Sequence, residues 1–133
     1  MIIGIGEDII DIRRIEKTLN RFGQRFEKRC FSGVELAKAE RRADAGLKPA
    51  TLAKRYAAKE ACAKALGTGL AKGVFWRDIA VYNKEGGQPA LTLSGKAIDR
   101  LKALTPAGRE AHIHVTLTDE PPYALAQVII EAR

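Results

Sequence analysis

Residues 49–67 form the clearest helix that this sequence predicts, and the rest of the chain must fold around it. Proline at position 49 and glycine at position 67 are typical of a helix start and a helix end. The segment includes the run RYAAKEACAKA at positions 55–65, in which alanine recurs throughout. Small side chains let another backbone or a ligand come close. We therefore predict a long central helix from Pro49 or Thr51 to Leu66 that permits close contacts.

One row of this helix carries an acid. Residues four apart lie on one face, which places Leu52, Tyr56, Glu60 and Lys64 in a slowly turning row. Glu60 then lies within the apolar stripe, where it should be paired, coordinated or protonated, because burying a bare carboxylate costs several kcal/mol, roughly. The alternative is a surface ion pair between Glu60 and Lys64, worth about 0.2–0.5 kcal/mol. The helix alone leaves both interpretations open.

Apolar periodicity and turn residues predict the other elements. The predicted strands cover residues 1–10, 78–84, 90–93, 112–118 and 124–131. The other predicted helices cover residues 12–22, 32–46 and 96–104. Asp11 is the predicted N-cap of the first, and Ser32 and Glu35 form a capping-box pattern at the start of the second. Helices and strands are interspersed without regular βαβ alternation. We therefore predict a single α+β domain over residues 1–133, with a largely antiparallel sheet packed against the central helix and further helices.

The first predicted strand carries two glycines followed by an acid. In the run GIGED at positions 4–8, both glycines share one face with Asp8, while Ile3 and Ile5 point to the other face. Glycine permits close approach of another chain or a ligand, and the Asp8 carboxylate can bind a hard cation through oxygen. The alternative is an aspartate that caps or turns the strand end. A dinucleotide-binding G-x-G-x-x-G motif is excluded, since its third glycine is absent.

The charge balance favours an anionic partner. Lysine and arginine number 23 against 16 acids, a formal net charge of +7, which suits nucleic acid, an acidic protein or a polyphosphate. No apolar run approaches the length of a membrane span, and the N-terminus lacks the basic start of a signal peptide, so we predict a cytoplasmic protein. Cys30 and Cys62 form no C-x-x-C pair and neither histidine lies beside them, which argues against a zinc site.

Basic residues gather on one face of the predicted helix 12–22 and just beyond it. They are Arg13, Arg14, Lys17, Arg21, Arg25 and Arg29, and the aromatic Phe26 lies between the last two. Such a surface suits an acidic partner that docks by charge and inserts an apolar anchor. A solvated helix face is the alternative.

Together these segments resemble the holo-acyl-carrier-protein synthase family of phosphopantetheinyl transferases. The family pattern is a strand G-I-G-x-D, then a helix [RF]-[FY]-A-x-K-E-A-x-x-K-A followed by G-T-G. Here the matching runs are GIGED at 4–8, RYAAKEACAKA at 55–65 and GTG at 67–69. The runs GQP at 87–89 and HVT at 114–116 are similar to a family turn and strand, with threonine in place of the usual serine. The larger relatives carry a second acid at the position of Ile10.

The resemblance implies a phosphopantetheinyl transferase fold and a magnesium-dependent enzyme. Its reaction would move the phosphopantetheine arm of coenzyme A to a serine of an acyl carrier protein, in fatty acid biosynthesis. Asp8 and Glu60 would bind magnesium, and Glu60 and Lys64 would be catalytic. Contacts to coenzyme A are implied for Arg55, Lys59, Lys64, Gly67 and His114. The acidic carrier would dock on Arg13, Arg14, Arg21, Arg25, Phe26 and Arg29. The resemblance also implies a homotrimer with sites shared between subunits.

Two other classes of function compete with this one. A nucleic-acid-binding module explains the charge of +7, but it explains neither Glu60 nor the G-x-D strand, and the aromatic residues form no stacking platform in sequence. A plain interaction domain would use the motif residues as surface ion pairs. Titration with coenzyme A, with and without magnesium, separates that domain from the enzyme. We predict neither a nucleic acid nor a membrane as partner.

Overall fold

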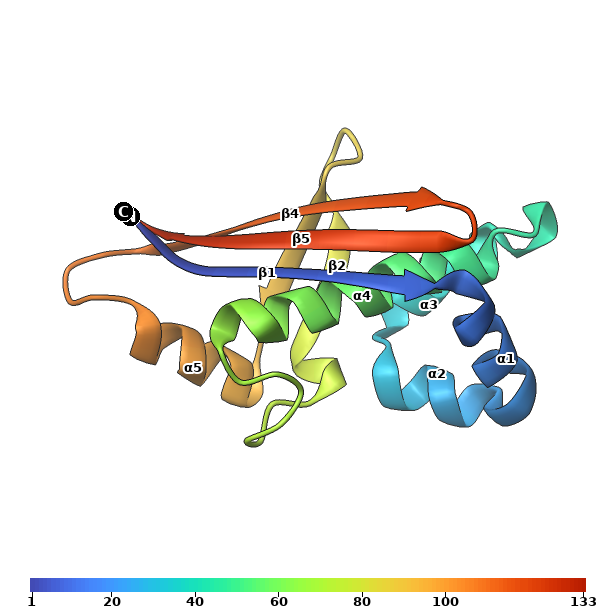
Figure 1. The fold of residues 1–133 in the computed structure, drawn as a ribbon, viewed down its shortest axis with the longest axis horizontal. Coiled ribbons are helices and arrows are strands. Elements are labelled where there is room, and N and C mark those ends of the chain that lie inside the picture. The colour runs from blue at the N-terminus through green and yellow to red at the C-terminus, as the bar shows by residue number, and fades with distance from the viewer.

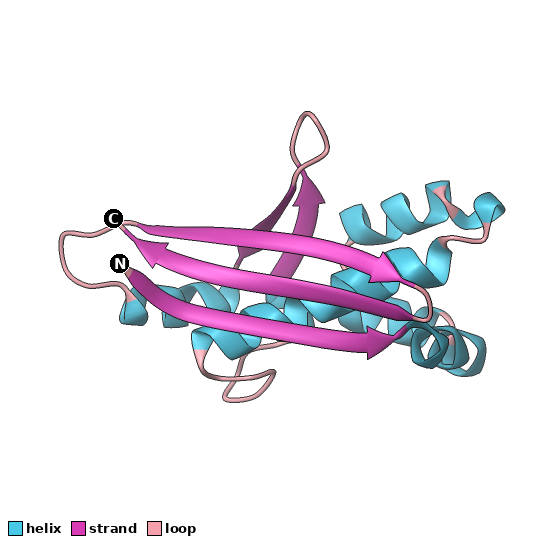
Figure 2. Cartoon of the chain, turned by 45° about the horizontal axis from the view of Figure 1, so that its top comes forward, coloured by secondary structure: helices cyan, strands magenta, loops and turns pink.

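In the computed structural model, which describes Met1–Arg133, the long helix α4 (Lys48–Leu66) runs beneath a three-stranded sheet (Figure 1). The strands are β1 (Ile2–Asp11), β5 (Tyr123–Ala132) and β4 (Ala111–Glu120), in that spatial order and all antiparallel. Both chain ends lie together at one end of this sheet (Figure 2). The predicted central helix and these three strands are confirmed.

The helix α4 packs so closely on β1 that β1 requires glycine. A Cβ atom on Gly6 would lie 1.9 Å from the carbonyl oxygen of Ala61, and one on Gly4 would lie 2.3 Å from that of Ala65. All the alanines of α4 from position 53 to position 65 are buried. The close approach expected from the sequence is therefore made by a helix of the same chain. This packing places the end of β1 beside the middle of α4.

Three shorter helices follow β1. Helix α1 (Ile12–Phe22) begins at Asp11, whose side chain accepts a hydrogen bond from the backbone N–H of Arg13 (2.9 Å). Helix α2 (Gln24–Cys30) was absent from the sequence prediction. Helix α3 (Gly33–Arg41) begins with the expected capping box. It ends earlier than predicted, because a 3-10 turn at Ala43–Ala45 follows and Gly46 takes a left-handed conformation.

A separate two-stranded sheet completes the fold. Strands β2 (Ile79–Asn83) and β3 (Pro89–Leu93) form the predicted hairpin, whose tip projects from the body (Figure 2). The 3-10 helix Trp76–Asp78 precedes it and helix α5 (Gly95–Leu104) follows it. The α+β class with a largely antiparallel arrangement is confirmed, although the strands form two sheets. None of the helices combines the length and apolar character that crossing a bilayer requires.

The two faces of the larger sheet differ. The inner face packs on α4 and contributes fully buried residues such as Ala126, Val128 and Ile130. On the outer face, Ile5 is 62% exposed and Ile9 is 60% exposed. The predicted opposition of the isoleucine and glycine faces is thus confirmed, and the glycine face is the buried one.

Candidate active site

The structure brings Asp8, Glu60 and Lys64 together where β1 crosses α4. The ammonium group of Lys64 donates to Oδ1 of Asp8 (3.0 Å) and to the backbone carbonyl oxygen of Glu7 (2.9 Å). The Lys64 side chain is 50% exposed and that of Asp8 is 18% exposed. Lys64 therefore forms its ion pair with Asp8 on β1. The alternative ion pair between Lys64 and Glu60, which the helix alone allowed, is not formed.

Glu60 is half-buried, and its surroundings favour the protonated form. Burial raises the pKa of its carboxyl group, and the negative charge of Asp8 raises it further. The positive charges of Lys64 and Arg14 act in the opposite direction but do not cancel the increase. In the fold, Glu60 therefore holds a proton more readily than an ordinary glutamate does.

The donor set at this position fits magnesium. Asp8 and Glu60 supply carboxylate oxygens, and the Glu7 carbonyl adds a hard oxygen beside them. An ammonium group already lies against two of these donors, which shows that they accept a cation. Magnesium prefers oxygen ligands and needs only one or two carboxylates from a protein. No third acid or histidine joins the pair, so the two carboxylates are the charged ligands that this chain can offer.

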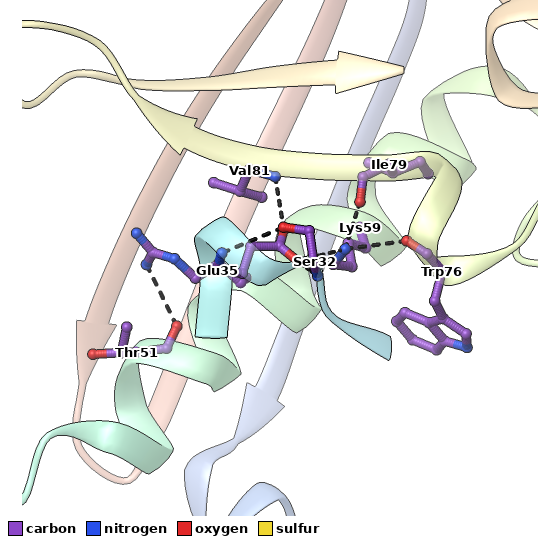
Figure 3. A network of polar contacts seen from close by, with 8 residues as sticks. Ser32, Glu35, Thr51, Lys59, Trp76, Ile79 and Val81 are labelled. Carbon is purple, nitrogen blue, oxygen red and sulfur yellow. Dashed lines mark hydrogen bonds and ion pairs between the residues drawn. The ribbon is translucent and has the colours of Figure 1, made fainter. Parts of the chain in front are cut away.

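The structure corrects the predicted contact between Lys59 and coenzyme A. The Lys59 side chain is fully buried, and the ammonium group pairs with Oε1 of Glu35 at 2.8 Å (Figure 3). The same group donates to the carbonyl oxygens of Trp76 (3.1 Å) and Ile79. With all three N–H bonds engaged inside the protein, Lys59 cannot reach coenzyme A in this fold. Its position joins α4 to α3 and to the start of β2.

Arg55 lies five residues before Glu60 on α4, about 1.4 turns, so it faces another direction. It is only 3% exposed and donates to Oδ1 of Asn83 (3.1 Å), while its Nε lacks a hydrogen-bond partner. Burial lowers the pKa of its guanidinium group. Nearby Lys38 also has a lowered pKa, first through burial and then through the charge of Arg55. A group of cations that repel each other favours an anion beside them.

Gly67 and His114 lie in different surroundings from the acidic pair. Gly67 ends α4 in a left-handed conformation (φ 79°), which glycine adopts without strain. His114 is exposed on β4, directly beside Ile129 of β5, and its Nε2 lies 3.1 Å from Oε1 of Glu131. Asp8 pairs with Ala126 on the inner face, so His114 lies on the opposite face of the sheet. A single chain does not bring these residues together.

A cavity of about 410 Å³ opens among the residues predicted to dock a carrier protein. Arg25, Phe26 and Arg29 line it. The lining also includes three aromatic residues that were not predicted as part of a docking site: Phe22, Tyr56 and Trp76. The Tyr56 and Trp76 ring centroids lie 4.3 Å apart, and Tyr56 is one turn before Glu60. The predicted row on α4 was the available signal, since it already placed Tyr56 beside Glu60.

Two of the remaining predicted docking residues, Arg14 and Arg21, lie beside residues that line this cavity. Arg14 lines a smaller hollow with Phe26 and Tyr56. Arg21 stacks on the Phe22 ring with 5.0 Å between its guanidinium carbon and the ring centroid. Arg13 forms an ion pair with Asp11 (2.6 Å) and is thereby partly neutralised. Basic residues therefore border an apolar hollow, and Tyr56 in its lining lies one helical turn from Glu60.

A family model described as the 4'-phosphopantetheinyl transferase superfamily matches residues 4–126. The chain belongs to this superfamily. The holo-[acyl-carrier-protein] synthase of Phenylobacterium zucineum is 58% identical over 132 residues, which cover 99% of this chain and 94% of that protein. The motif resemblance is therefore confirmed.

Solved structures of similar proteins confirm the phosphopantetheinyl transferase fold. The holo-[acyl-carrier-protein] synthase of Helicobacter pylori, in complex with coenzyme A, aligns with a TM-score of 0.80 at 29% identity, covering 96% of this chain and 99% of that chain. The enzyme from Neisseria meningitidis aligns with a TM-score of 0.80 at 36% identity, covering 98% of this chain and 99% of that chain.

In this phosphopantetheinyl transferase the candidate residues fall into separate groups. Asp8, Glu60 and Lys64 lie where β1 meets α4, and the basic cavity opens beside them. Arg55 faces the β2–β3 hairpin, and His114 lies on the outer face of the sheet. On one copy these groups do not share a surface, because Asp8 and His114 face opposite sides of the sheet.

Proposed function

We propose that this phosphopantetheinyl transferase moves the 4'-phosphopantetheine arm of coenzyme A to a serine of apo-acyl carrier protein. The meeting of Asp8, Glu60 and Lys64 carries the proposal. The similar Helicobacter pylori enzyme, solved with coenzyme A, supports it. We also propose that the reaction serves fatty acid biosynthesis in the cytoplasm.

The reaction exchanges one phosphorus–oxygen bond for another. The serine hydroxyl oxygen forms a bond to the β-phosphorus of coenzyme A, and the bond from that phosphorus to the bridging oxygen breaks. Adenosine 3',5'-bisphosphate leaves with that oxygen. The serine proton must pass to a base, and the leaving phosphate needs its charge stabilised.

The chain's own residues meet these needs. Asp8 and Glu60 would hold Mg²⁺, which when bound would neutralise charge on the two phosphates. Glu60, or a water molecule that it orients, accepts the serine proton. The Lys64 ammonium, which is half exposed, stabilises charge on the leaving phosphate.

We propose that other parts of coenzyme A contact Arg55, Gly67 and His114. For Arg55, nearby cations such as Lys38 favour an anionic group beside the β2–β3 hairpin, although the Nε of Arg55 is itself buried. Gly67 ends α4 one turn beyond Lys64, where a main-chain contact is accessible because glycine presents no side chain. Lys59 is left out of this set because its ammonium group is engaged in the core.

We propose that three copies assemble around the outer faces of their larger sheets. The exposed Ile5 and Ile9 support this arrangement, because large apolar groups side by side on a sheet surface favour contact with protein. His114 lies on the same face, so assembly would bring it to a neighbouring copy. Light scattering should report a trimer, and Ile9→Glu should shift it to monomer with loss of coenzyme A binding. A wild-type monomer that binds coenzyme A fully would refute the shared site.

We propose that the carrier protein docks on the basic surface around the cavity. Arg25 and Arg29 attract an acidic helix, and the aromatic lining accepts an apolar side chain from it. Reversing the charges of Arg14 and Arg25 should slow association with the carrier strongly and leave coenzyme A affinity nearly unchanged. Equal losses for both substrates would count against this surface.

Mass spectrometry of an apo carrier protein tests the proposed reaction. The carrier is incubated with this protein, coenzyme A and Mg²⁺, and it should gain the mass of one phosphopantetheine group. The variant Glu60→Gln should abolish the gain. A carrier of unchanged mass with the wild-type protein would refute the proposed function.

A further inference from the structure

The Lys64 ammonium group lies beside the carboxylate oxygen of Asp8 that would bind the metal ion. It makes two contacts to β1, to Oδ1 of Asp8 (3.0 Å) and to the carbonyl oxygen of Glu7 (2.9 Å). Both contacts cross from α4 to β1, and the two elements are held in close register by the glycine packing at Gly6. The ammonium position is therefore set by the fold, not by a chance surface encounter.

We infer that Lys64 competes with the divalent cation for Asp8, and that coenzyme A relieves this competition. The inference rests on the function proposed above. A cation that binds Asp8 through Oδ1 must replace the Lys64 contact, because an ammonium group and a metal ion repel each other at such short range. Lys64 can withdraw, since its side chain is long and half exposed. Metal binding by the protein alone is consequently weakened.

The diphosphate of coenzyme A gives Lys64 another anionic partner. Once Lys64 turns to the diphosphate, both Asp8 and Glu60 are free to hold the cation. The cation and coenzyme A then bind cooperatively, and by thermodynamic reciprocity each strengthens the other by the same factor. Lys64 thus couples the arrival of the two ligands, in addition to stabilising charge during the reaction. This coupling disfavours a metal ion bound without its substrate.

Manganese binding to the full-length protein tests this role without measuring activity. Free Mn²⁺ is followed by electron paramagnetic resonance, with and without saturating coenzyme A. Removing the ammonium in Lys64→Met should tighten Mn²⁺ binding about 5- to 10-fold in the absence of coenzyme A, the range expected for a modest coupling between charged groups. The factor by which coenzyme A tightens Mn²⁺ binding should fall in the same variant.

A matched control comes from the same helix. Lys54 pairs with Asp119 at 3.3 Å, so Lys54→Met removes an identical charge from an ion pair that does not involve Asp8. Its Mn²⁺ affinity should stay within about 2-fold of wild type. The variant Lys64→Gln provides a second substitution at the same position, and circular dichroism checks that each variant is folded.

The outcomes separate this inference from the proposed function. Equal or weaker Mn²⁺ binding in both Lys64 variants overturns the competition, even if the carrier protein is still modified. Tighter binding of similar size in the Lys54→Met control also overturns it, because the effect would then be one of net charge. If Asp8→Asn binds Mn²⁺ as well as wild type does, Asp8 is not a ligand, and the proposed metal site fails together with this inference.

Discussion

Replacing Lys59 by methionine should destabilise this protein more than replacing Lys54 or Lys64 by methionine. The ammonium group is fully buried and pairs with Glu35, which is also fully buried. Glu35 uses its other contacts to accept from the backbone N–H groups of Ser32 and Val81, both at 2.7 Å (Figure 3). Methionine fills a similar volume but leaves the carboxylate without its cation. The carbonyl oxygens of Trp76 and Ile79 lose their donor as well.

The size of the effect follows from this burial. Removing one partner of a buried ion pair costs about 3–5 kcal/mol, because the remaining charge is left uncompensated. For 133 residues the unfolding entropy is roughly 0.28 kcal/mol/K, at about 2.1 cal/mol/K per residue. The melting temperature should therefore fall by about 11–18 °C. A loss of this size is a large part of the roughly 5–15 kcal/mol that stabilises a typical domain.

Urea unfolding followed by circular dichroism measures this loss. The control is Lys54→Met on the same helix, whose partly exposed pair with Asp119 should cost less than about 1 kcal/mol. The double variant Lys59→Met with Glu35→Leu should recover part of the loss, since it removes the unpaired carboxylate. Below its melting temperature, Lys59→Met should still bind coenzyme A. A loss under about 1 kcal/mol in Lys59→Met would refute the argument from burial.

Three further predictions concern β1, the site and the first helix. Gly6→Ala should lower the free energy of unfolding in urea by about 3 kcal/mol, because the new Cβ would meet the Ala61 carbonyl. The control Gly33→Ala meets nothing within 4 Å and should be near neutral. Similar unfolding midpoints for the two variants would contradict the packing. Glu60→Gln should lose turnover yet raise the melting temperature, since burial and the charge of Asp8 disfavour the ionised carboxyl group in the fold. A lower melting temperature than that of the wild type would contradict this reasoning. Hydrogen bonds from Arg13 lower the pKa of Asp11 from 3.8 to about 2, so the ionised Asp11 stabilises the fold above pH 3.8 and this stabilisation is lost as the pH falls towards about 2. The melting temperature of Asp11→Asn should therefore differ from that of the wild type at about pH 5 and match it near pH 2. A difference that stays constant with pH would contradict this prediction.

The elements that the sequence predicted well are those with local signals. Helix α4 has proline and glycine at its ends and an alanine-rich interior, and β1 has an apolar run with alternating faces. Helix α2 was missed, although Phe26 and Cys30 are four residues apart between Gly23 and Ser32. Its seven residues are too few for periodicity to stand out.

The errors at the site come from contacts between distant segments. The burial of Lys59 depends on Glu35, 24 positions earlier, which the sequence identified only as part of a capping box. The aromatic cavity joins Phe22, Tyr56 and Trp76 from three separate elements, so no local pattern marks it. By contrast, Asp8 and Glu60 were linked through the family motifs before the fold was known. Their placement beside each other needed only the packing of one strand on one helix.

Anomalous diffraction from crystals grown with coenzyme A and Mn²⁺ tests the central claim most directly. One strong peak should lie about 2.1 Å from a carboxylate oxygen of Asp8, from one of Glu60 and from oxygens of the coenzyme A diphosphate. A well-ordered coenzyme A whose diphosphate binds no metal, or a metal held by only one of these two acids, would contradict the account.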